Sequence, residues 1–165
     1  MHPNILFAGY GRAGKDEAAQ YLAWITKLRY AGSFSWAALP HMAQHLGMHP
    51  QQAWETRHHH RALWKTELDR LREHDQCYLA RLVLKQGELA AGIRDKAEVD
   101  AVKREGLFDH IIWVHRPGIP VDPTVTFSPE DCNGEISNGG DLFEFHAKLK
   151  RLAGLLNLPA RGVVT

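Results

Sequence analysis

A glycine-rich loop that ends in a lysine is the feature of this sequence best suited to chemistry. Residues 9–15 read Gly-Tyr-Gly-Arg-Ala-Gly-Lys, which fits the pattern G-x-x-x-x-G-K. Such a loop turns backbone N–H groups toward the phosphates of a nucleotide, and its lysine reaches the β- and γ-phosphates. The residues expected to bind nucleotide phosphates are Gly9, Gly11, Arg12, Ala13, Gly14, Lys15 and Asp16.

The residue that follows the lysine departs from the usual pattern. Asp16 stands where a Ser or Thr hydroxyl ordinarily binds Mg²⁺. A carboxylate is also a hard oxygen ligand, and it could hold Mg²⁺ directly or through a water molecule. The alternative is an acid in the first turn of a helix, where the helix dipole favours negative charge. We expect Asp16 to be the metal-binding residue of the loop.

The segments around the loop are those that can position it. Residues 4–8 form an apolar run that indicates a buried strand, and apolar residues at helical spacing predict a helix over 14–28. A break is indicated at 32–34, and a short strand could precede it. Further strands are predicted over 88–93, 110–114 and 135–137, and further helices over 96–105 and 141–156. This alternation favours an α/β fold with a mainly parallel sheet of about four to five strands flanked by helices.

Two longer segments and the end of the chain complete this outline. Residues 36–86 are predicted to be almost wholly helical, with breaks near Gly47 and Pro50. Residues 117–134 are rich in Pro, Gly and Asp and predict a loop long enough to act as a lid. We expect the tail over 159–165 to be loosely held.

The composition limits the class of protein. The 165 residues suit one domain, assigned to 1–158, and 44% hydrophobic with 24% charged residues is typical of a globular protein. No apolar run approaches the ~20 residues that cross a bilayer, so we expect no membrane partner. Cys77 and Cys132 are too few for a disulfide framework or a zinc cluster, and we expect two reduced thiols and a cytoplasmic location.

The loop from Gly9 to Asp16, directly after a strand, resembles that of the phage deoxynucleoside monophosphate kinase group of P-loop kinases. This group includes the phage 5-hydroxymethyluracil DNA kinases. Later segments are similar to the same group in their order and spacing, namely 33–37, 61–78, 91–98, 113–117, 128–130 and 136–140. The resemblance implies a P-loop NTPase three-layer fold, with a helical acceptor region at 36–86 and a lid. It also implies an ATP-dependent kinase that uses Mg²⁺ in the cytoplasm of a host bacterium.

The resemblance further implies roles for residues outside the loop. Lys15 would bind the transferring phosphate, and Arg94 would contact phosphate or the acceptor. Arg116 would approach ATP from the lid, Asn138 would lie at the nucleotide, and Arg72 would hold the acceptor. Each arginine could instead be a surface charge or part of a structural ion pair. The implied catalytic residues are Lys15, Asp16, Arg94 and Arg72.

Two positions depart from the pattern of the group. Gly92 replaces an acid at the end of a strand, which leaves Asp16, Asp95, Glu98 or water alone to bind the metal. Trp36 replaces an acid in a segment that lies toward the acceptor in the group. The donor side of the site is therefore expected to be retained and the acceptor side to be altered.

Two acceptors fit these residues. A free deoxynucleoside monophosphate would need arginines around its phosphate, and Arg57, Arg61, Arg70 and Arg72 are available. The hydroxymethyl group of 5-hydroxymethyluracil in DNA would need basic residues and aromatic faces for a displaced base, which Trp36 and the segment 54–64 supply. These aromatic residues favour the DNA base. The expected acceptor-binding residues are Trp36, Arg57, Arg61, Trp64, Arg72 and Asp75.

Each of these interpretations has an alternative. The segment 54–64 could be an amphipathic helix whose tryptophans pack in the core. A hydroxyl acceptor benefits from a general base, for which Asp75, Asp16 and the histidines at 58–60 are candidates. A protein of another class, a nucleotide- or metal-binding regulatory module without turnover, is also compatible with the sequence. Its metal ligands would be histidines at helical spacing, His41, His45 and His49.

Overall fold

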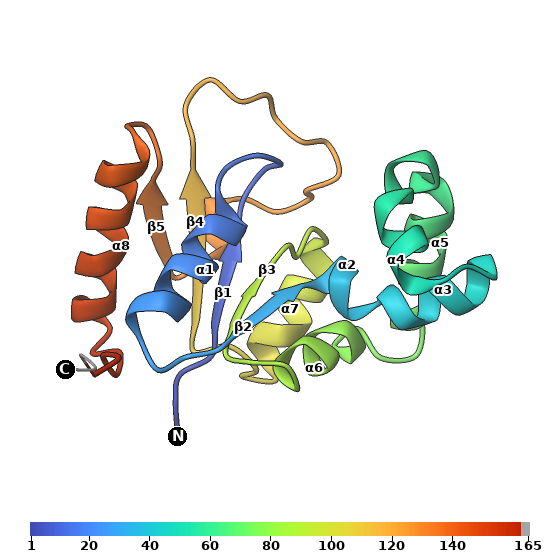
Figure 1. Cartoon of the computed structure of the whole chain (residues 1–165), viewed down its shortest axis with the longest axis horizontal. Coiled ribbons are helices and arrows are strands. Elements are labelled where there is room, and N and C mark those ends of the chain that lie inside the picture. The colour runs from blue at the N-terminus through green and yellow to red at the C-terminus, as the bar shows by residue number, and fades with distance from the viewer. Residues whose placement is uncertain (163–165) are drawn as a thin grey trace.

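A sheet of parallel strands forms the centre of the computed structural model, which describes residues 1–162 (Figure 1). The strand order is β2-β3-β1-β4-β5, and every neighbouring pair is parallel. The strands are β1 (Ile5–Ala8), β2 (Tyr30–Ser33), β3 (Leu89–Ala91), β4 (His110–His115) and β5 (Gly134–Ser137). The predicted α/β class is confirmed, and the 5-stranded sheet agrees with the expected number of strands.

Helices cover both faces of the sheet because the side chains of β1 alternate between two cores. Leu6 and Ala8 pack on one face, and Ile5 and Phe7 pack on the other. All four side chains are fully buried, as expected for a central strand of a parallel sheet. The first core contains residues of α6 (Tyr78–Leu84) and α7 (Lys96–Arg104), and the second contains residues of α1 (Lys15–Ile25) and α8 (Leu142–Leu155).

The predicted helices are correct in place, with small differences at their ends. α1 ends at Ile25, before the predicted end at 28, because Thr26 has an extended backbone. The carboxylate of Asp141 caps α8 by accepting a hydrogen bond from the Glu144 N–H at 2.8 Å. Within residues 1–162, none of the helices combines the length and the apolar character needed to cross a membrane.

A helical segment projects beyond the β2 edge of the sheet (Figure 1). It contains α2 (Phe34–Ala37), α3 (Leu39–Leu46), α4 (Pro50–Glu55), the 3₁₀ turn η1 (Arg57–His59) and α5 (Arg61–Arg72). The segment has a small core of its own, which includes Met42, Ala53 and Trp64. The prediction of helices broken near Gly47 and Pro50 is confirmed: Gly47 ends α3 in a left-handed conformation, with φ +63°, and Pro50 begins α4.

The loop predicted over 117–134 is shorter by its last residue, because Gly134 begins β5. It contains one 3₁₀ turn, η2 (Pro129–Asp131), and follows β4 at the carboxyl edge of the sheet (Figure 1).

The first residues of the tail, which was expected to be loosely held, make backbone hydrogen bonds to the end of α1 and the chain after it. The Pro159 carbonyl accepts a hydrogen bond from the Lys27 N–H at 2.9 Å, and the Arg161 N–H donates to the Ile25 carbonyl at 3.0 Å. These bonds pair the chain after α8 with the chain after α1, so tertiary contacts replace the fraying expected at a terminus. Residues 163–165 of that tail lie outside the described residues.

Candidate functional site

The glycine-rich loop connects β1 directly to α1 at the carboxyl edge of the sheet (Figure 1). Gly9 and Gly14 have φ values of +142° and +101°, which residues with a side chain rarely adopt. A Cβ atom at Gly9 would lie 2.6 Å from the Val114 carbonyl oxygen, and one at Gly14 would lie 2.6 Å from the Asn138 side-chain amide. The glycines therefore let the loop pack against β4 and against the turn after β5.

Two residues expected at the nucleotide instead contact the loop itself. The Asn138 amide donates to the Ala13 carbonyl at 2.9 Å, and the Arg116 guanidinium donates to the Arg12 carbonyl at 3.3 Å. Asn138 follows β5 and Arg116 follows β4, so the chain after each of these two strands contacts the loop. Asn138 and Arg116 are positioned to hold the loop in shape, and neither lines the neighbouring cavity.

A cavity of about 620 Å³ lies beside the loop. The residues that line it come from the loop, α1, β2, the helical segment, the chain just before β3 and the chain just after β3. They are Gly11, Arg12, Lys15, Asp16, Gln20, Tyr30, Ala31, Gly32, Ser33, Ser35, Trp36, Trp54, Arg57, Gln86, Gly92 and Arg94. Of the residues expected from sequence, the structure brings Gly11, Arg12, Lys15, Asp16, Arg94, Trp36 and Arg57 together here.

Lys15 and Asp16 are the first two residues of α1, and both face this cavity. The Lys15 ammonium donates to the Tyr10 carbonyl at 2.6 Å, and burial together with the charge of Arg94 lowers the pKa of Lys15. The Asp16 carboxylate accepts a hydrogen bond from the Tyr30 hydroxyl at 2.9 Å. Burial and the charge of Asp16 raise the pKa of Tyr30 to about 12, so this hydroxyl remains a donor at neutral pH.

Arg94 is held by an acid of the loop between β4 and β5. Its guanidinium donates to Asp122 at 2.7 Å and to the Thr124 hydroxyl at 2.5 Å. Burial opposes ionisation of Asp122, but hydrogen bonds from Thr124 and the charge of Arg94 outweigh it and lower the pKa of Asp122 to about 2. Sequence reasoning missed Asp122 and Tyr30, although an acid within an expected lid was a signal for the first.

The far side of the cavity is aromatic. The rings of Trp36 and Trp54 meet edge to face, with centroids 4.9 Å apart and an angle of 88° between their planes. The Arg57 guanidinium lies 4.0 Å from the centroid of the Trp54 ring, within the range of a cation–π interaction. Trp54 was part of the expected aromatic segment, but it was not expected among the binding residues.

Four residues expected at the acceptor do not line the cavity, namely Arg61, Trp64, Arg72 and Asp75. Arg61 is exposed at the start of α5, and Trp64 is buried in the core of the helical segment. Asp75 forms an ion pair with Arg81 at 2.5 Å. Helical periodicity turns Trp64 inward, which agrees with the alternative that the tryptophans of this segment pack in a core.

Arg72 lies in a buried ion pair. It donates to Glu98 at 2.7 Å and to Asp69 at 2.6 Å, and its side chain is 13% exposed. The Glu98 side chain is only 1% exposed, and one of its carboxylate oxygens has no hydrogen-bond partner among the described residues. Burial raises the pKa of Glu98 to about 7, although the charge of Arg72 opposes this shift. The position of Arg72 therefore fits the alternative of a structural ion pair.

The acids considered for a metal are separated by the fold. Asp16 lines the cavity, whereas Asp95 caps α7 by accepting from the Ala97 N–H at 2.8 Å and Glu98 is paired with Arg72. Gly92, where the resemblance to the kinase group leads us to expect an acid, also lines the cavity. Asp16 is thus the residue of this group that could hold Mg²⁺ at the loop, with its carboxylate as a hard oxygen ligand.

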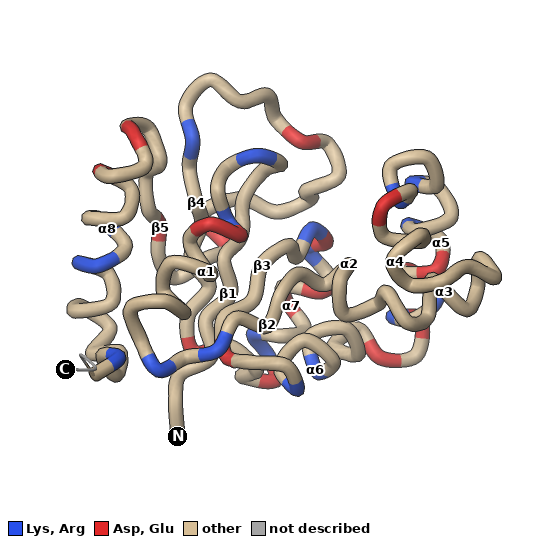
Figure 2. Tube along the Cα trace, viewed as in Figure 1, with Lys and Arg blue, Asp and Glu red and all other residues tan. Residues whose placement is uncertain are grey.

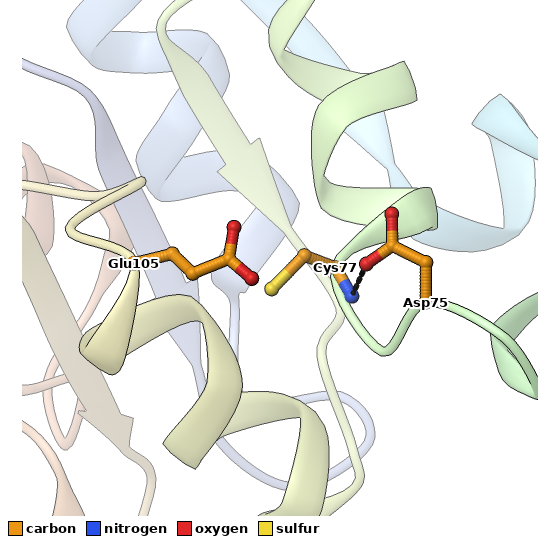
Figure 3. Close-up of side chains that lie close together, drawn as sticks. All are labelled: Asp75, Cys77 and Glu105. Carbon is orange, nitrogen blue, oxygen red and sulfur yellow. Dashed lines mark hydrogen bonds between the residues drawn. The ribbon is translucent and has the colours of Figure 1, made fainter.

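A second group of polar side chains lies on the face of the sheet that α6 and α7 cover, where Asp75, Cys77 and Glu105 approach one another (Figure 3). Their potential ligand atoms lie within 4.8 Å of one another. Arg81 already forms ion pairs with both carboxylates, and Asp75 also accepts a hydrogen bond from the Cys77 N–H. These contacts describe an ion-pair cluster at the start of α6.

The histidines at helical spacing have three separate partners. His41 shares a hydrogen bond with the Tyr78 hydroxyl at 3.1 Å, and His45 lies 3.7 Å from Glu67. His49 caps α4 by accepting from a backbone N–H. The described structure therefore does not gather these three rings around a shared metal position.

The helix α5 carries acids as well as bases (Figure 2). Lys65 pairs with Asp69 at 2.6 Å, and Arg70 pairs with Glu67 at 2.6 Å. These pairs neutralise much of the positive charge of α5.

No protein-family model and no curated protein matches the chain.

Proposed function

We propose that this protein is an ATP-dependent kinase with a P-loop-type three-layer fold. The observation that carries the proposal is a G-x-x-x-x-G-K loop between the central strand β1 and α1, with Lys15 facing a cavity. Ligands of open α/β sheets bind at the carboxyl ends of the strands, which is where this cavity lies. The all-parallel order β2-β3-β1-β4-β5 is compatible with such a fold.

The residues at the cavity could perform phosphoryl transfer by positioning and charge neutralisation. Backbone N–H groups of the loop and the start of α1 would bind phosphate oxygens. Lys15 would exchange the Tyr10 carbonyl for a phosphate oxygen, and Arg94 would exchange Asp122 for another. Asp16 would hold Mg²⁺, which when bound supplies further positive charge to the phosphates.

For the acceptor, we propose the 5-hydroxymethyl group of hydroxymethyluracil in DNA. A mononucleotide would bring a second phosphate that needs several cations, yet Arg70 and Arg72 are paired with carboxylates and lie outside the lining of the cavity. On the aromatic side of the cavity Arg57 is the lining arginine, and it lies on a tryptophan ring. A hydroxyl on a planar base suits this aromatic, weakly cationic surface better than a phosphate does.

In the proposed transfer the acceptor hydroxyl oxygen forms a bond to the γ-phosphorus of ATP. The bond from that phosphorus to the β–γ bridging oxygen breaks, and ADP leaves. The hydroxyl proton passes to a water molecule, because Asp16, the carboxylate among the residues that line the cavity, is assigned to Mg²⁺ in this proposal. Asp75 and the histidines at 58–60, also considered as the general base, do not line the cavity.

Two other functions have one favourable observation each. The presence of Arg57 in the lining of the cavity is compatible with a deoxynucleoside monophosphate acceptor. The absence of an acid at Gly92 is compatible with a nucleotide-binding regulatory module without turnover.

An experiment with γ-labelled ATP and Mg²⁺ separates these functions. The protein is incubated with DNA that contains 5-hydroxymethyluracil and, separately, with mixed deoxynucleoside monophosphates. The proposal requires label in the DNA. Label only in deoxynucleoside diphosphates would replace it with the mononucleotide kinase, and nucleotide binding without transfer to either acceptor would favour the regulatory module.

A further inference from the structure

Trp36 is held in one orientation at the edge of the cavity. It lies in α2, and its backbone N–H donates to the Ser33 hydroxyl that caps this helix, at 3.1 Å. Its ring packs on Gly32, where a Cβ atom would come within 3.1 Å of the indole Cδ1 atom. Gly32 has a φ of +85°, so both its conformation and its missing side chain make room for the indole.

Trp54 and Arg57 support the same surface from the helical segment. The Trp54 ring meets Trp36 at one side and packs near the buried Trp64 at the other, with ring centroids 6.1 Å apart. Arg57 is fixed by a hydrogen bond from its guanidinium to the Trp54 carbonyl at 2.8 Å and by its position over the Trp54 ring. Trp64, Trp54 and Trp36 thus form a row of three aromatic rings. The buried Trp64 anchors one end of the row, and Trp36 at the other end borders the cavity.

The ring at the cavity end of this row remains accessible. Trp36 is 48% exposed although its neighbours hold it firmly, and it lines the same cavity as Lys15. A large aromatic side chain that is both fixed and exposed loses little conformational entropy when it stacks on a ligand. A base has a π face that such a ring can cover, and an adjacent guanidinium can pair with a backbone phosphate.

We propose that Trp36, backed by Trp54 and Arg57, is a stacking site for an unpaired base of a DNA strand. This inference rests on the proposed function and specifies the form of its substrate. The base must leave the duplex or come from a single strand, because a base within a duplex has both faces covered by its neighbours. Stacking on Trp36 places the base in the same cavity as Lys15 and Arg94.

Binding of a fluorescently labelled oligonucleotide tests this inference without requiring turnover. The probe is a short DNA strand that carries one 5-hydroxymethyluracil, compared with the same strand in a duplex, and its fluorescence anisotropy is titrated with protein. We expect the single strand to bind at least about tenfold more tightly than the duplex, since unstacking and unpairing a base is costly.

The variants Trp36→Ala and Trp36→Phe test the role of the ring. Trp36→Ala should weaken binding of the single strand about tenfold or more, whereas Trp36→Phe should retain most of it. Trp24→Ala is the matched control, because Trp24 is 68% exposed on α1 and does not line the cavity. Circular dichroism confirms that each variant is folded. Equal affinity of Trp36→Ala and Trp24→Ala, or equal affinity for duplex and single strand, would overturn the inference.

Arg57→Gln provides a second measurement if Trp36→Ala does not fold. It should lower the slope of log affinity against log salt concentration by about 0.7, the value for one phosphate contact with a single strand. An unchanged slope would contradict the role of Arg57.

Transfer of labelled phosphate by the native protein, measured beside DNA binding by Trp36→Ala, separates this inference from the proposed function. If the native protein transfers no phosphate but Trp36→Ala still weakens binding, the kinase proposal fails and the stacking site stands. If DNA is phosphorylated and Trp36→Ala binds normally, the kinase proposal stands and the stacking site fails.

Discussion

The charged residues at the glycine-rich loop and those on helix α5 have different kinds of partners. In the loop region, Lys15 and Asp16 face a cavity, and each makes a hydrogen bond to an uncharged group. On α5, Arg70 and Arg72 are bound by carboxylates, and Arg72 is largely buried with Glu98. Both regions are rich in charge, but a ligand could take up the charges of Lys15 and Asp16 without breaking an ion pair, whereas Arg70 and Arg72 would each have to leave a carboxylate.

This difference shows what makes a cation available for function. A lysine bonded to a backbone carbonyl can exchange that partner for a phosphate oxygen and gain electrostatic energy. An arginine that leaves a buried carboxylate exposes an unpaired charge in the interior, which costs several kcal/mol. We therefore expect Lys15 to act at the site and Arg72 to stabilise the fold.

The largest effect expected in the loop region comes from Lys15→Ala. Removing the cation that would meet the transferring phosphate should lower kcat about 10²–10³-fold, the usual loss when one charge-stabilising group is removed. The measurement is transfer of labelled phosphate under saturating ATP. Lys27→Ala is the control, since Lys27 is an exposed lysine just beyond α1. Normal turnover by Lys15→Ala would remove the loop from the mechanism.

The largest effect expected on stability comes from Arg72→Ala. This change leaves Glu98 buried without its partner and should lower the free energy of unfolding by about 3 kcal/mol. Urea unfolding measures the loss, and Arg61→Ala, an exposed arginine of the same helix, should leave stability nearly unchanged. If Arg72→Ala is as stable as the control but binds the acceptor poorly, Arg72 belongs to the site and the comparison above is wrong.

The pH dependence of stability tests whether Glu98, in its pair with Arg72, holds a proton in the folded protein. Burial raises the pKa of Glu98 to about 7, whereas the pKa of a glutamate in an unfolded chain is about 4.3. The folded protein therefore binds this proton more strongly, and the contribution of Glu98 to stability is fully present below about pH 4.3. It is lost as the pH rises through about 7, with a slope of at most about 1.4 kcal/mol per pH unit.

Glu98→Gln should remove this slope between about pH 4.3 and 7. The check is a series of urea unfolding curves across that range, with the exposed Glu130→Gln as the control that keeps the native slope. Identical slopes for the native protein and Glu98→Gln would show that Glu98 does not hold a proton in the folded state.

The smallest effect is expected from Asp122→Asn. The change frees Arg94 from its carboxylate and removes a negative charge near the phosphate loop, so the KM for ATP should fall about two- to fivefold, as for a half-exposed ion pair. Steady-state kinetics at varied ATP measure it, with Glu130→Gln of the same loop as the control. A higher KM would show that Asp122 helps to bind the nucleotide instead of competing with it.

Much of the fold could be predicted because its elements have strong local patterns. The apolar runs of β1 and β4 and the helical spacing in α1 and α8 were sufficient to place them. The strand β2 was harder, since Tyr-Ala-Gly-Ser has little apolar character. The sequence indicated a break near its end and left a short strand before that break as an open alternative. Its pairing with β3 is accompanied by tertiary contacts just before the two strands, where the Glu88 N–H donates to the Arg29 carbonyl and the two side chains form an ion pair.

By itself, the sequence determined the α/β class, the glycine-rich loop and the presence of Lys15 and Asp16 at the end of that loop. These residues are neighbours in the chain, so the local geometry of a strand, a tight turn and a helix places them. Only the tertiary structure decided which arginines remain available. Arg94 meets Asp122 and Arg72 meets Glu98 across 28 and 26 positions in the chain. Ion pairs between residues so far apart depend on how helices and loops pack, and residue spacing does not encode that packing.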